Sequence, residues 1–228
     1  FPDLFLDGEE VVITEKVHGM QCRLGLIRDV DDKGNAVYVF MAGSHEVRRK
    51  EFAIQRKRRR DRETGQEEVV EVSTKSRFWE ALSEPVRALL CDVSSHGPNG
   101  SFVDHLPNHN VVLFGEIYGS GIQDMTYGLD RGRCEFRAFD LTVNGRWLDH
   151  DIKASLFAKH EVPMVPVLYR GPFSKEVVER YVSGPTTLCT QSEAGRFKGR
   201  EGIVIVTAKE RTADTDRKWF DRTALKVV

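Results

Sequence analysis

Lys16 stands in the tetrapeptide Lys16-Val17-His18-Gly19, at the end of a run of β-favouring residues. A lysine amine is a poor nucleophile while it is protonated, and its pKa in a free chain is about 10.4. Burial and neighbouring cations lower such a pKa and expose the lone pair. A glycine shortly after the lysine lets a phosphate approach the backbone. The tetrapeptide is therefore a candidate for nucleophilic chemistry on phosphorus, although a single lysine at a strand end is more often an ordinary exposed side chain.

Further short segments with chemical potential follow this lysine in order along the chain. They are Phe114-Gly115-Glu116, Phe139-Asp140, Glu201-Gly202-Ile203-Val204-Ile205 and Leu225-Lys226-Val227-Val228. A lysine that attacks a nucleotide needs three kinds of partner: a flat surface for the purine, an acceptor for the ribose hydroxyls and cations for the phosphates. Cations matter because negative charge builds on the phosphate oxygens in the transition state.

The ordered set resembles nucleotidyltransferase motifs I, III, IIIa, IV and V of ATP-dependent polynucleotide ligases. His18 is typical of the RNA-ligase branch, which includes the phage ligase-2, kinetoplastid editing and Deinococcus-type enzymes, whereas DNA ligases usually carry Asp at that position. The resemblance runs from Lys16 to the last residue. It implies a nucleotidyltransferase (ATP-grasp-like) domain over residues 1–228 that uses ATP with Mg²⁺ or Mn²⁺. It also implies RNA partners with 3′-hydroxyl and 5′-phosphate ends, in a nicked duplex or a broken loop.

The resemblance also assigns roles to the motif residues. Lys16 would attack the α-phosphorus of ATP, expel pyrophosphate and hold AMP as a phosphoramidate. The AMP would then move to an RNA 5′-phosphate, and a 3′-hydroxyl would displace it. Phe139 matches the residue that stacks on the purine, and Glu116 matches the one that binds the ribose. Lys226 matches a lysine that contacts the α-phosphate, and Glu201 is a candidate metal ligand, directly or through water.

Motifs I and Ia complete the expected nucleotide-binding set. The remaining motif I residues are Val17, His18, Gly19 and Gln21, where Gln21 replaces an Asn that relatives often have. Motif Ia falls in the segment from Gly43 to Arg48. Within it, His45 and Arg48 compete for the role of contacting RNA or the AMP phosphate, and the sequence favours Arg48.

Each assignment has an ordinary structural alternative. Phe139 is otherwise a core residue, Asp140 a cap or bridge between loops, Glu116 a surface strand residue and Glu201 a solvated turn residue. Rival functions are a DNA ligase, a GTP-dependent capping-type enzyme or a degenerate RNA-binding module without catalysis. His18 weighs against a DNA ligase. The mass of a covalent nucleotide adduct would identify a GTP-using enzyme, and failure to form any adduct would favour the non-catalytic module.

Two positions depart from the ligase-2 pattern, because Val206 and Val228 stand where relatives often have lysines. Other cations could replace these lysines, and the candidates are Lys198, Arg200 and Lys209. Alternatively, an accessory domain outside this chain handles the pyrophosphate. We expect such a domain, because the chain has only 15 residues before Lys16 and ends just after motif V.

The elements that must position these residues are mostly strands. Strands are predicted over Val11–Lys16, Cys22–Arg28, Ala36–Met41, Val111–Tyr118, Glu135–Val143, Met164–Tyr169, Gly202–Thr207 and Thr223–Val228. Helices are predicted over Ser76–Leu90, Asp151–His160 and Ser174–Val182. Strands that outnumber helices and follow one another directly favour an α+β fold, with antiparallel sheets packed together and flanked by helices.

The charge distribution leaves open where RNA would bind. The chain has 228 residues, 40% of them hydrophobic, and a net charge of -1, so any RNA surface depends on local segregation of basic residues. The segment from Arg48 to Glu71 is dominated by charge, with the basic run Arg56–Arg60 at its centre. It is predicted to be an exposed loop, and the basic run is either a solvated surface or an RNA contact.

Composition also bears on the compartment. No apolar run reaches the roughly 20 residues that cross a bilayer, and no signal peptide is visible. The cysteines are scattered and form no Cys-x-x-Cys pair, which argues against structural zinc; they are Cys22, Cys91, Cys134 and Cys189. Reduced thiols in an intracellular compartment, cytoplasmic or nuclear, are the expected state.

Overall fold

The computed structural model describes residues 4–60, 65–97, 109–189, 199–211 and 222–228. Its strands are β1 (Glu10–Glu15), β2 (Met20–Val30), β3 (Ala36–Gly43), β4 (Phe52–Arg60), β5 (Glu67–Lys75), β6 (Val111–Gly119), β7 (Cys134–Val143), β8 (Arg146–Trp147), β9 (Val167–Pro172), β10 (Ile203–Thr207) and β11 (Ala224–Val227). Its helices are α1 (Arg77–Ala81), α2 (Glu84–His96), α3 (His150–Lys159) and α4 (Lys175–Val182).

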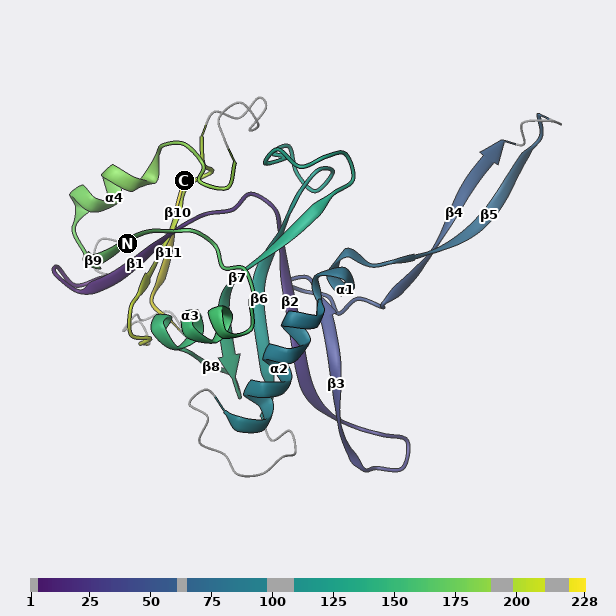
Figure 1. Ribbon diagram of the computed structural model, residues 1–228, viewed down its shortest axis with the longest axis horizontal. Coiled ribbons are helices and arrows are strands. Elements are labelled where there is room, and N and C mark those ends of the chain that lie inside the picture. The colour runs from purple at the N-terminus through teal and green to yellow at the C-terminus, as the bar shows by residue number, and fades with distance from the viewer. Residues whose placement is uncertain (1–3, 61–64, 98–108, 190–198, 212–221) are drawn as a thin grey trace.

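The strands form two main sheets and a separate ribbon, all with antiparallel pairing. The four-stranded sheet has the order β11-β10-β1-β9, the five-stranded sheet has the order β3-β2-β6-β7-β8, and β4 pairs with β5 alone. In Figure 1 the helices α1, α2 and α3 lie over the five-stranded sheet, while α4 lies beside the four-stranded one. The predicted α+β architecture of antiparallel sheets with flanking helices is confirmed.

Alternation along the strands gives the five-stranded sheet one apolar and one polar face. In β2, Leu24 and Leu26 face a core that also contains the fully buried Leu89 and Leu90 of α2. Burial of each leucine stabilises the fold by roughly 1.5–3 kcal/mol. Since successive side chains of a strand point to opposite faces, Arg23 faces away from this core, toward the other sheet.

The four-stranded sheet is arranged in the same way. Val11 and Ile13 of β1 pack in a second core whose partly buried members include Val178 of α4. Val12, which points to the opposite face, packs with Val206 of β10. The polar face of one sheet and the inner face of the other therefore confront each other, and each outer face is covered by helix.

The lysine motif lies where the chain crosses from one sheet to the other. β1 belongs to the four-stranded sheet and β2 to the five-stranded sheet, so residues 16–19 form the connection. The amide of Lys16 donates to the carbonyl of Gly202, with an N···O distance of 3.0 Å. This bond fixes the connection to the start of β10.

The segment predicted as an exposed loop between Arg48 and Glu71 is instead largely a β-ribbon, although its exposure is as expected. β4 and β5 pair in register from Phe52 opposite Lys75 to Arg60 opposite Glu67. The prediction of a loop failed because it gave more weight to the five consecutive basic residues than to the strand-favouring residues around them, which are Ile54 and the valines of β5. Cross-strand pairing outweighs the low β-propensity of the charged residues.

The single helix predicted over Ser76–Leu90 is two helices. α1 ends at Ala81, and α2 begins at Glu84 with Pro85 in its first turn. Proline lacks an N–H and is tolerated in the first turn of a helix but not in its interior. A helix that continued through Pro85 would lose a backbone hydrogen bond, so a new helix starts there.

The strand predicted over Met164–Tyr169 begins later, at Val167. The strand starts late because Pro166, just before it, has no N–H to donate to a neighbouring strand. The carbonyl of Pro166 still accepts a hydrogen bond from the amide of Glu15, at 2.9 Å. Met164 instead forms an isolated parallel bridge with Ala138 of β7.

Within the described residues, no helix is long and apolar enough to cross a membrane. Within the described part of the chain, none of the four cysteines forms a disulfide bond.

Candidate active site

A cavity of about 1140 Å³ separates the two sheets. This volume is slightly above the roughly 300–1,000 Å³ typical of small-molecule sites. Its polar lining comes from both sheets and from α3, and includes Thr14, Glu15, Lys16, Gln21, Arg23, His45, Glu116, Asp140, His150, Lys153, Arg222 and Lys226. Its apolar lining includes Val17, Phe114, Phe139, Trp147, Val204 and Val206. The cavity therefore offers both ring-stacking surfaces and charged groups.

Lys16 enters this cavity from the end of β1. Its Nζ contacts Oε1 of Glu201, and Nδ1 of His18 lies 3.2 Å from the other oxygen of the same carboxylate. The side chains of Lys16 and Glu201 are only 21% and 25% exposed. The predicted nucleophile and the predicted motif IV acid are thus neighbours, although 185 positions separate them in sequence.

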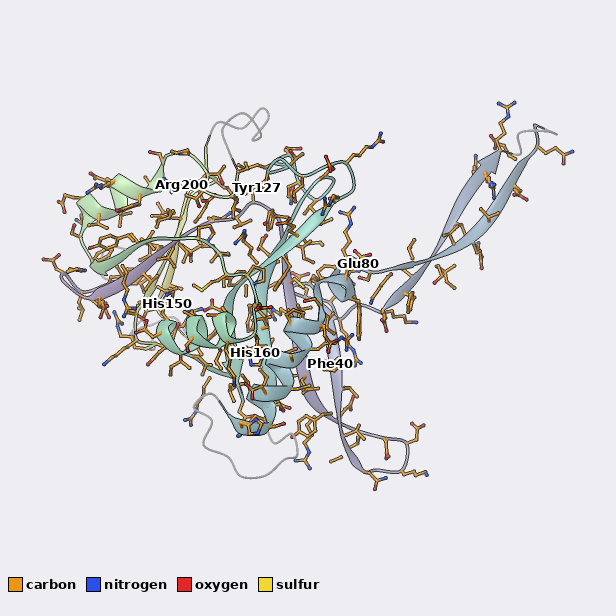
Figure 2. The ribbon with its side chains drawn as sticks, in the orientation of Figure 1. Phe40, Glu80, Tyr127, His150, His160 and Arg200 are labelled. Carbon is orange, nitrogen blue, oxygen red and sulfur yellow. The ribbon has the colours of Figure 1, made fainter. Side chains whose placement is uncertain are left out.

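Two groups that sequence reasoning missed hold the lysine motif in place. The hydroxyl of Tyr127, which Figure 2 labels, accepts from the amide of His18 at 2.7 Å. Glu15 is buried, and its carboxylate accepts from the hydroxyl of Thr186 and from both the amide and the hydroxyl of Thr187, at 2.8 and 2.7 Å. A buried carboxylate with three donors anchors the end of β1 directly beside Lys16.

Gly19 allows the lysine connection to pass close to β6. A Cβ atom at this position would lie 2.3 Å from the carbonyl oxygen of Ile117 and 2.9 Å from Cγ of Glu116. Any side chain would therefore push the connection away from Glu116. The glycine of the motif has a packing reason as well as the expected phosphate-approach role.

Glu116 lies opposite Gln21 across the β2–β6 pair, and both residues line the cavity. Burial raises the pKa of Glu116 to about 7, and the nearby carboxylate of Glu201 also acts to raise it. Lys226 and Lys16 act in the opposite direction. The structure thus places Glu116 among the motif residues and does not support the alternative of an ordinary surface strand residue.

Replacing Glu116 with glutamine should stabilise the protein at high pH. Its folded pKa of about 7 lies above the ordinary value of 4.5, so the folded state binds the proton more tightly. Wild-type stability therefore falls as the pH rises between these two values, and Glu116→Gln removes that loss. We expect a gain of about 3 kcal/mol at pH 8 and less than about 1 kcal/mol at pH 5, measured by urea unfolding. Equal effects at the two pH values would contradict the buried position of this carboxyl.

A β-bulge directs two consecutive residues of β7 into the cavity. The β6–β7 register places Phe114 opposite Asp140 but Gly115 opposite Ala138, so Phe139 is the extra residue. A bulge re-aims side chains that would otherwise alternate between faces. Phe139 and Asp140 therefore both line the cavity, which neither would do together in a regular strand.

Phe139 packs at the edge of a small apolar cluster that contains Val17, Tyr127 and Val165. It is only partly buried, and its remaining surface faces the cavity. The ring of Phe139 therefore packs against apolar neighbours, as a core residue would, and also presents an available stacking surface to the cavity.

Asp140 belongs to a buried ionic cluster that the sequence did not reveal. Nζ of Lys153 contacts one of its oxygens, and Arg222 contacts the other. Arg222 also contacts Glu210 and lies over the ring of Trp147, 4.5 Å from its centroid. Lys153 is 1% exposed, so its charge depends on these carboxylates. The reading of Asp140 as a bridge is the one that the structure supports.

His150 at the start of α3 adds a neutral ring to the same wall (Figure 2). Burial, together with the nearby charge of Lys153, lowers the pKa of His150 to about 4. Among the described residues, its Nδ1 has no hydrogen-bond partner.

Strand periodicity could have identified two cations that sequence reasoning missed. Arg23 follows Gln21 by two residues, and Arg222 precedes Lys226 by four, so each shares a face with a motif residue if the strand alternation continues. Both arginines line the cavity, as Lys226 does. Arg23 provides positive charge that the valines at positions 206 and 228 do not, whereas the charge of Arg222 is matched by its contacts with Asp140 and Glu210.

The substitutes proposed from sequence do not fill this role in the described structure. Arg200 donates to the carbonyl of Ser183 at 3.0 Å, Lys209 is exposed, and neither lines the cavity. Lys198 lies outside the described residues. Of the two motif Ia candidates, His45 lines the cavity, whereas Arg48 is exposed and forms a backbone bridge with Gly43 outside it. The sequence preference for Arg48 is therefore not supported by its position.

The carboxylates near Lys16 suit a metal ion that takes most of its ligands from the phosphates of a bound substrate. Among the described residues, no cluster of three or more His, Cys, Asp or Glu side chains is arranged to bind a metal alone. Magnesium in phosphate-transfer sites is usually held by one or two carboxylates together with phosphates and water. Glu201, with one oxygen beside Lys16 and the other beside His18, is placed for such a role.

The two packed antiparallel sheets, with Lys16 in the connection between them, form a nucleotidyltransferase-type fold. The model of the RNA ligase family matches residues 9–228, and the chain belongs to that family. Among curated proteins, a sequence search finds no significant match.

Solved structures of a Naegleria gruberi RNA ligase share the fold. The pyrophosphate complex aligns with a TM-score of 0.54 and 17% identity over 95% of this chain and 49% of that one. A substituted form with ATP and manganese gives 0.55 and 17% over the same shares. Another such form gives 0.53 and 16% over 97% and 56%. This chain thus spans about half the length of those structures.

Proposed function

We propose that this chain is the catalytic module of an ATP-dependent RNA ligase. In this proposal Lys16 takes AMP from ATP, the AMP passes to an RNA 5′-phosphate, and a 3′-hydroxyl displaces it to form the phosphodiester. The observation that carries the proposal is the meeting of Lys16, Glu116, Phe139 and Lys226 around one cavity, with Glu201 in contact with Lys16, in a member of the RNA ligase family.

Each residue has a chemical task in the first step. Nζ of Lys16 forms a bond to the α-phosphorus as the bond from that phosphorus to the pyrophosphate oxygen breaks. Nζ must lose a proton before it attacks, and the carboxylate in contact with it is Glu201. Lys226 and Arg23 offset the negative charge on the phosphates.

The other residues bind the nucleoside. Phe139 offers a face on which the purine stacks, opposite the apolar surface of Val204 and Val206. Glu116 accepts hydrogen bonds from ribose hydroxyls, which requires its deprotonated form. Adenosine binding therefore favours the carboxylate that burial disfavours in the free protein.

Bound Mg²⁺ or Mn²⁺ would supply Lewis-acid charge on the phosphates, with Glu201 as the protein ligand. The Naegleria structures with ATP and manganese support this cofactor pair for the fold. The proposed partners are RNA ends in a nicked duplex or a broken loop. The proposed location is intracellular, cytoplasmic or nuclear.

We also propose that the natural enzyme has an accessory domain in addition to this nucleotidyltransferase domain. The chain spans about half of the Naegleria structures, and Val206 lines the cavity where a lysine is common in relatives. Val228 is 82% exposed, so its side chain does not contribute to the cavity wall. A further domain would then supply contacts to the departing pyrophosphate.

Nucleotide identity provides the first test. After incubation with Mg²⁺ and either ATP or GTP, intact-mass measurement should show one added AMP and no added GMP. A GMP adduct would indicate a capping-type enzyme. The absence of any adduct, in a chain that still binds RNA, would favour a non-catalytic RNA-binding module.

A further inference from the structure

The β4–β5 ribbon projects away from the two-sheet body as an arm (Figure 1). Each strand has nine residues, and nine residues at about 3.3 Å each give a reach on the order of 30 Å. In Figure 2 its side chains extend into open space along most of its length. The arm therefore contributes little to the core. Its length and exposure indicate a function at the protein surface.

The base of the arm is firmly attached to the body. The amide of Ser76 donates to the carbonyl of Glu51 at 2.8 Å, which closes the two strands where they enter the body. Nε1 of Trp79 donates to the carbonyl of Arg49 at 2.8 Å, and Trp79 packs against the main core. The base of the arm is thus tied to the body that contains the cavity.

One strand of the arm is strongly basic. β4 carries the five consecutive basic residues Arg56–Arg60 and no acidic residue, whereas β5 carries three glutamates and one lysine. Because the whole chain has a net charge of -1, this strand is a marked local concentration of positive charge.

Part of that charge is not neutralised within the arm. Arg56 pairs with Glu71 at 3.0 Å, and Nε of Arg60 donates to the carbonyl of Gly65 at 3.2 Å. Arg58 lies opposite Val69 in the register and, among the described residues, has no ion-pair partner. Its guanidinium is exposed and available to an external anion.

The same face of the arm also carries exposed apolar side chains. Residues directly opposite in an antiparallel pair share a face, so Phe52, Ile54 and Val69 lie on the face of Arg56 and Arg58. Phe52, Ile54 and Val69 are 55%, 71% and 62% exposed. Arginines next to exposed apolar surface suit a ligand that presents both phosphates and ribose or base surface.

We propose that this face of the β4–β5 arm binds the RNA backbone at a distance from the ends that are joined. The proposal rests on the proposed RNA ligase function and adds a substrate-length dependence to it. Arginine forks bind phosphate oxygens in pairs, and each neutralised phosphate releases counterions. The arm would then hold RNA on one side of the junction while the cavity acts on the ends.

A protein partner is the less favoured occupant. The usual way for a protein to use an open ribbon edge is to add a strand, and a run of charged residues on an edge strand opposes such pairing. The run of positive charge instead complements a polyanion. Binding that does not weaken with salt would point to the protein alternative.

The test compares Arg56→Gln/Arg58→Gln/Arg60→Gln with a control that removes the same charge elsewhere, Lys33→Gln/Lys175→Gln/Arg180→Gln. Fluorescence anisotropy would measure affinity for a short nicked RNA duplex and for a longer one that is extended by about 30 Å, the reach of the arm. The arm variant should bind the longer RNA about 10- to 100-fold more weakly and reduce its salt slope by about 2. It should match wild type on the shorter RNA.

Equal losses in the control, or unchanged affinity of the arm variant for long RNA, would overturn the proposal. Lysyl-AMP formation from ATP is measured in parallel and should be unchanged in both variants. Loss of the adduct in wild type itself would reject the proposed function rather than the arm. If the triple variant unfolds, a chain with residues 52–75 replaced by two glycines tests the same point, because the Ser76–Glu51 bond places the joined ends together.

Discussion

Replacing Lys153 with alanine should lower the free energy of unfolding by about 3 kcal/mol. Its ammonium group is buried against Asp140, and removal leaves a buried carboxylate with one partner fewer. Loss of one member of a buried pair usually costs about 3–5 kcal/mol, and the remaining contact from Arg222 places this case at the lower end. Urea unfolding at pH 7 measures the effect.

Lys159 in the same helix provides a matched control. It pairs with Asp92 at 2.7 Å, but its side chain is 61% exposed. An exposed ion pair contributes at most about 1 kcal/mol, so Lys159→Ala should cost far less than Lys153→Ala. Similar losses for the two variants would show that Lys153 does not carry a buried charge.

The Lys153 variant should also bind adenosine nucleotides more weakly. Asp140 follows Phe139 directly in the β7 bulge, so the ionic cluster fixes the residue next to the proposed stacking ring.

Double-mutant analysis of Lys153→Ala with Asp140→Asn should show strong non-additivity in the free energy of unfolding, because the two groups contact each other.

Replacing Lys16 with alanine should abolish the sealing of RNA that carries an ordinary 5′-phosphate. No other group would replace the amine as the acceptor of AMP. Joining of RNA that already carries a 5′-adenylate should persist, because that step needs no lysine nucleophile. The fold should change little, since the Lys16–Glu201 pair is partly solvated.

Lys209→Ala is the control for this experiment, because Lys209 is exposed and outside the cavity. It should seal both substrates at the wild-type rate. If Lys16→Ala loses both activities while it remains folded, Lys16 has a role other than the nucleophile.

The sequence was sufficient to predict the fold class, because the strands follow from local patterns. Alternation of apolar residues identified the strands. The order of the motifs identified the candidate site residues Lys16, Glu116, Phe139, Glu201 and Lys226. Glu201 contacts Lys16, and the other four residues line the cavity. Those residues were identified by their resemblance to the ligase motifs, whereas period-two alternation predicts only the strands near which they lie.

The features that the sequence did not predict depend on pairing between distant segments. The bulge at Phe139 is a property of the β6–β7 register, and the partners of Asp140 come from α3 and from the approach to β11. The ribbon over Arg56–Arg60 forms because β5 pairs with β4. A run of charged residues gives no indication of such pairing in the sequence. Cross-strand and cross-element contacts of this kind leave no periodic signal in either partner alone.

Peptide mapping of the wild-type chain after incubation with ATP and Mg²⁺ tests the central claim most directly. The account predicts a single AMP on the peptide that contains Lys16, with fragment ions that place it on the Nζ atom. AMP attached to a different residue, with Lys16→Ala still labelled to the same extent, would contradict the assignment of the nucleophile and with it the proposed mechanism.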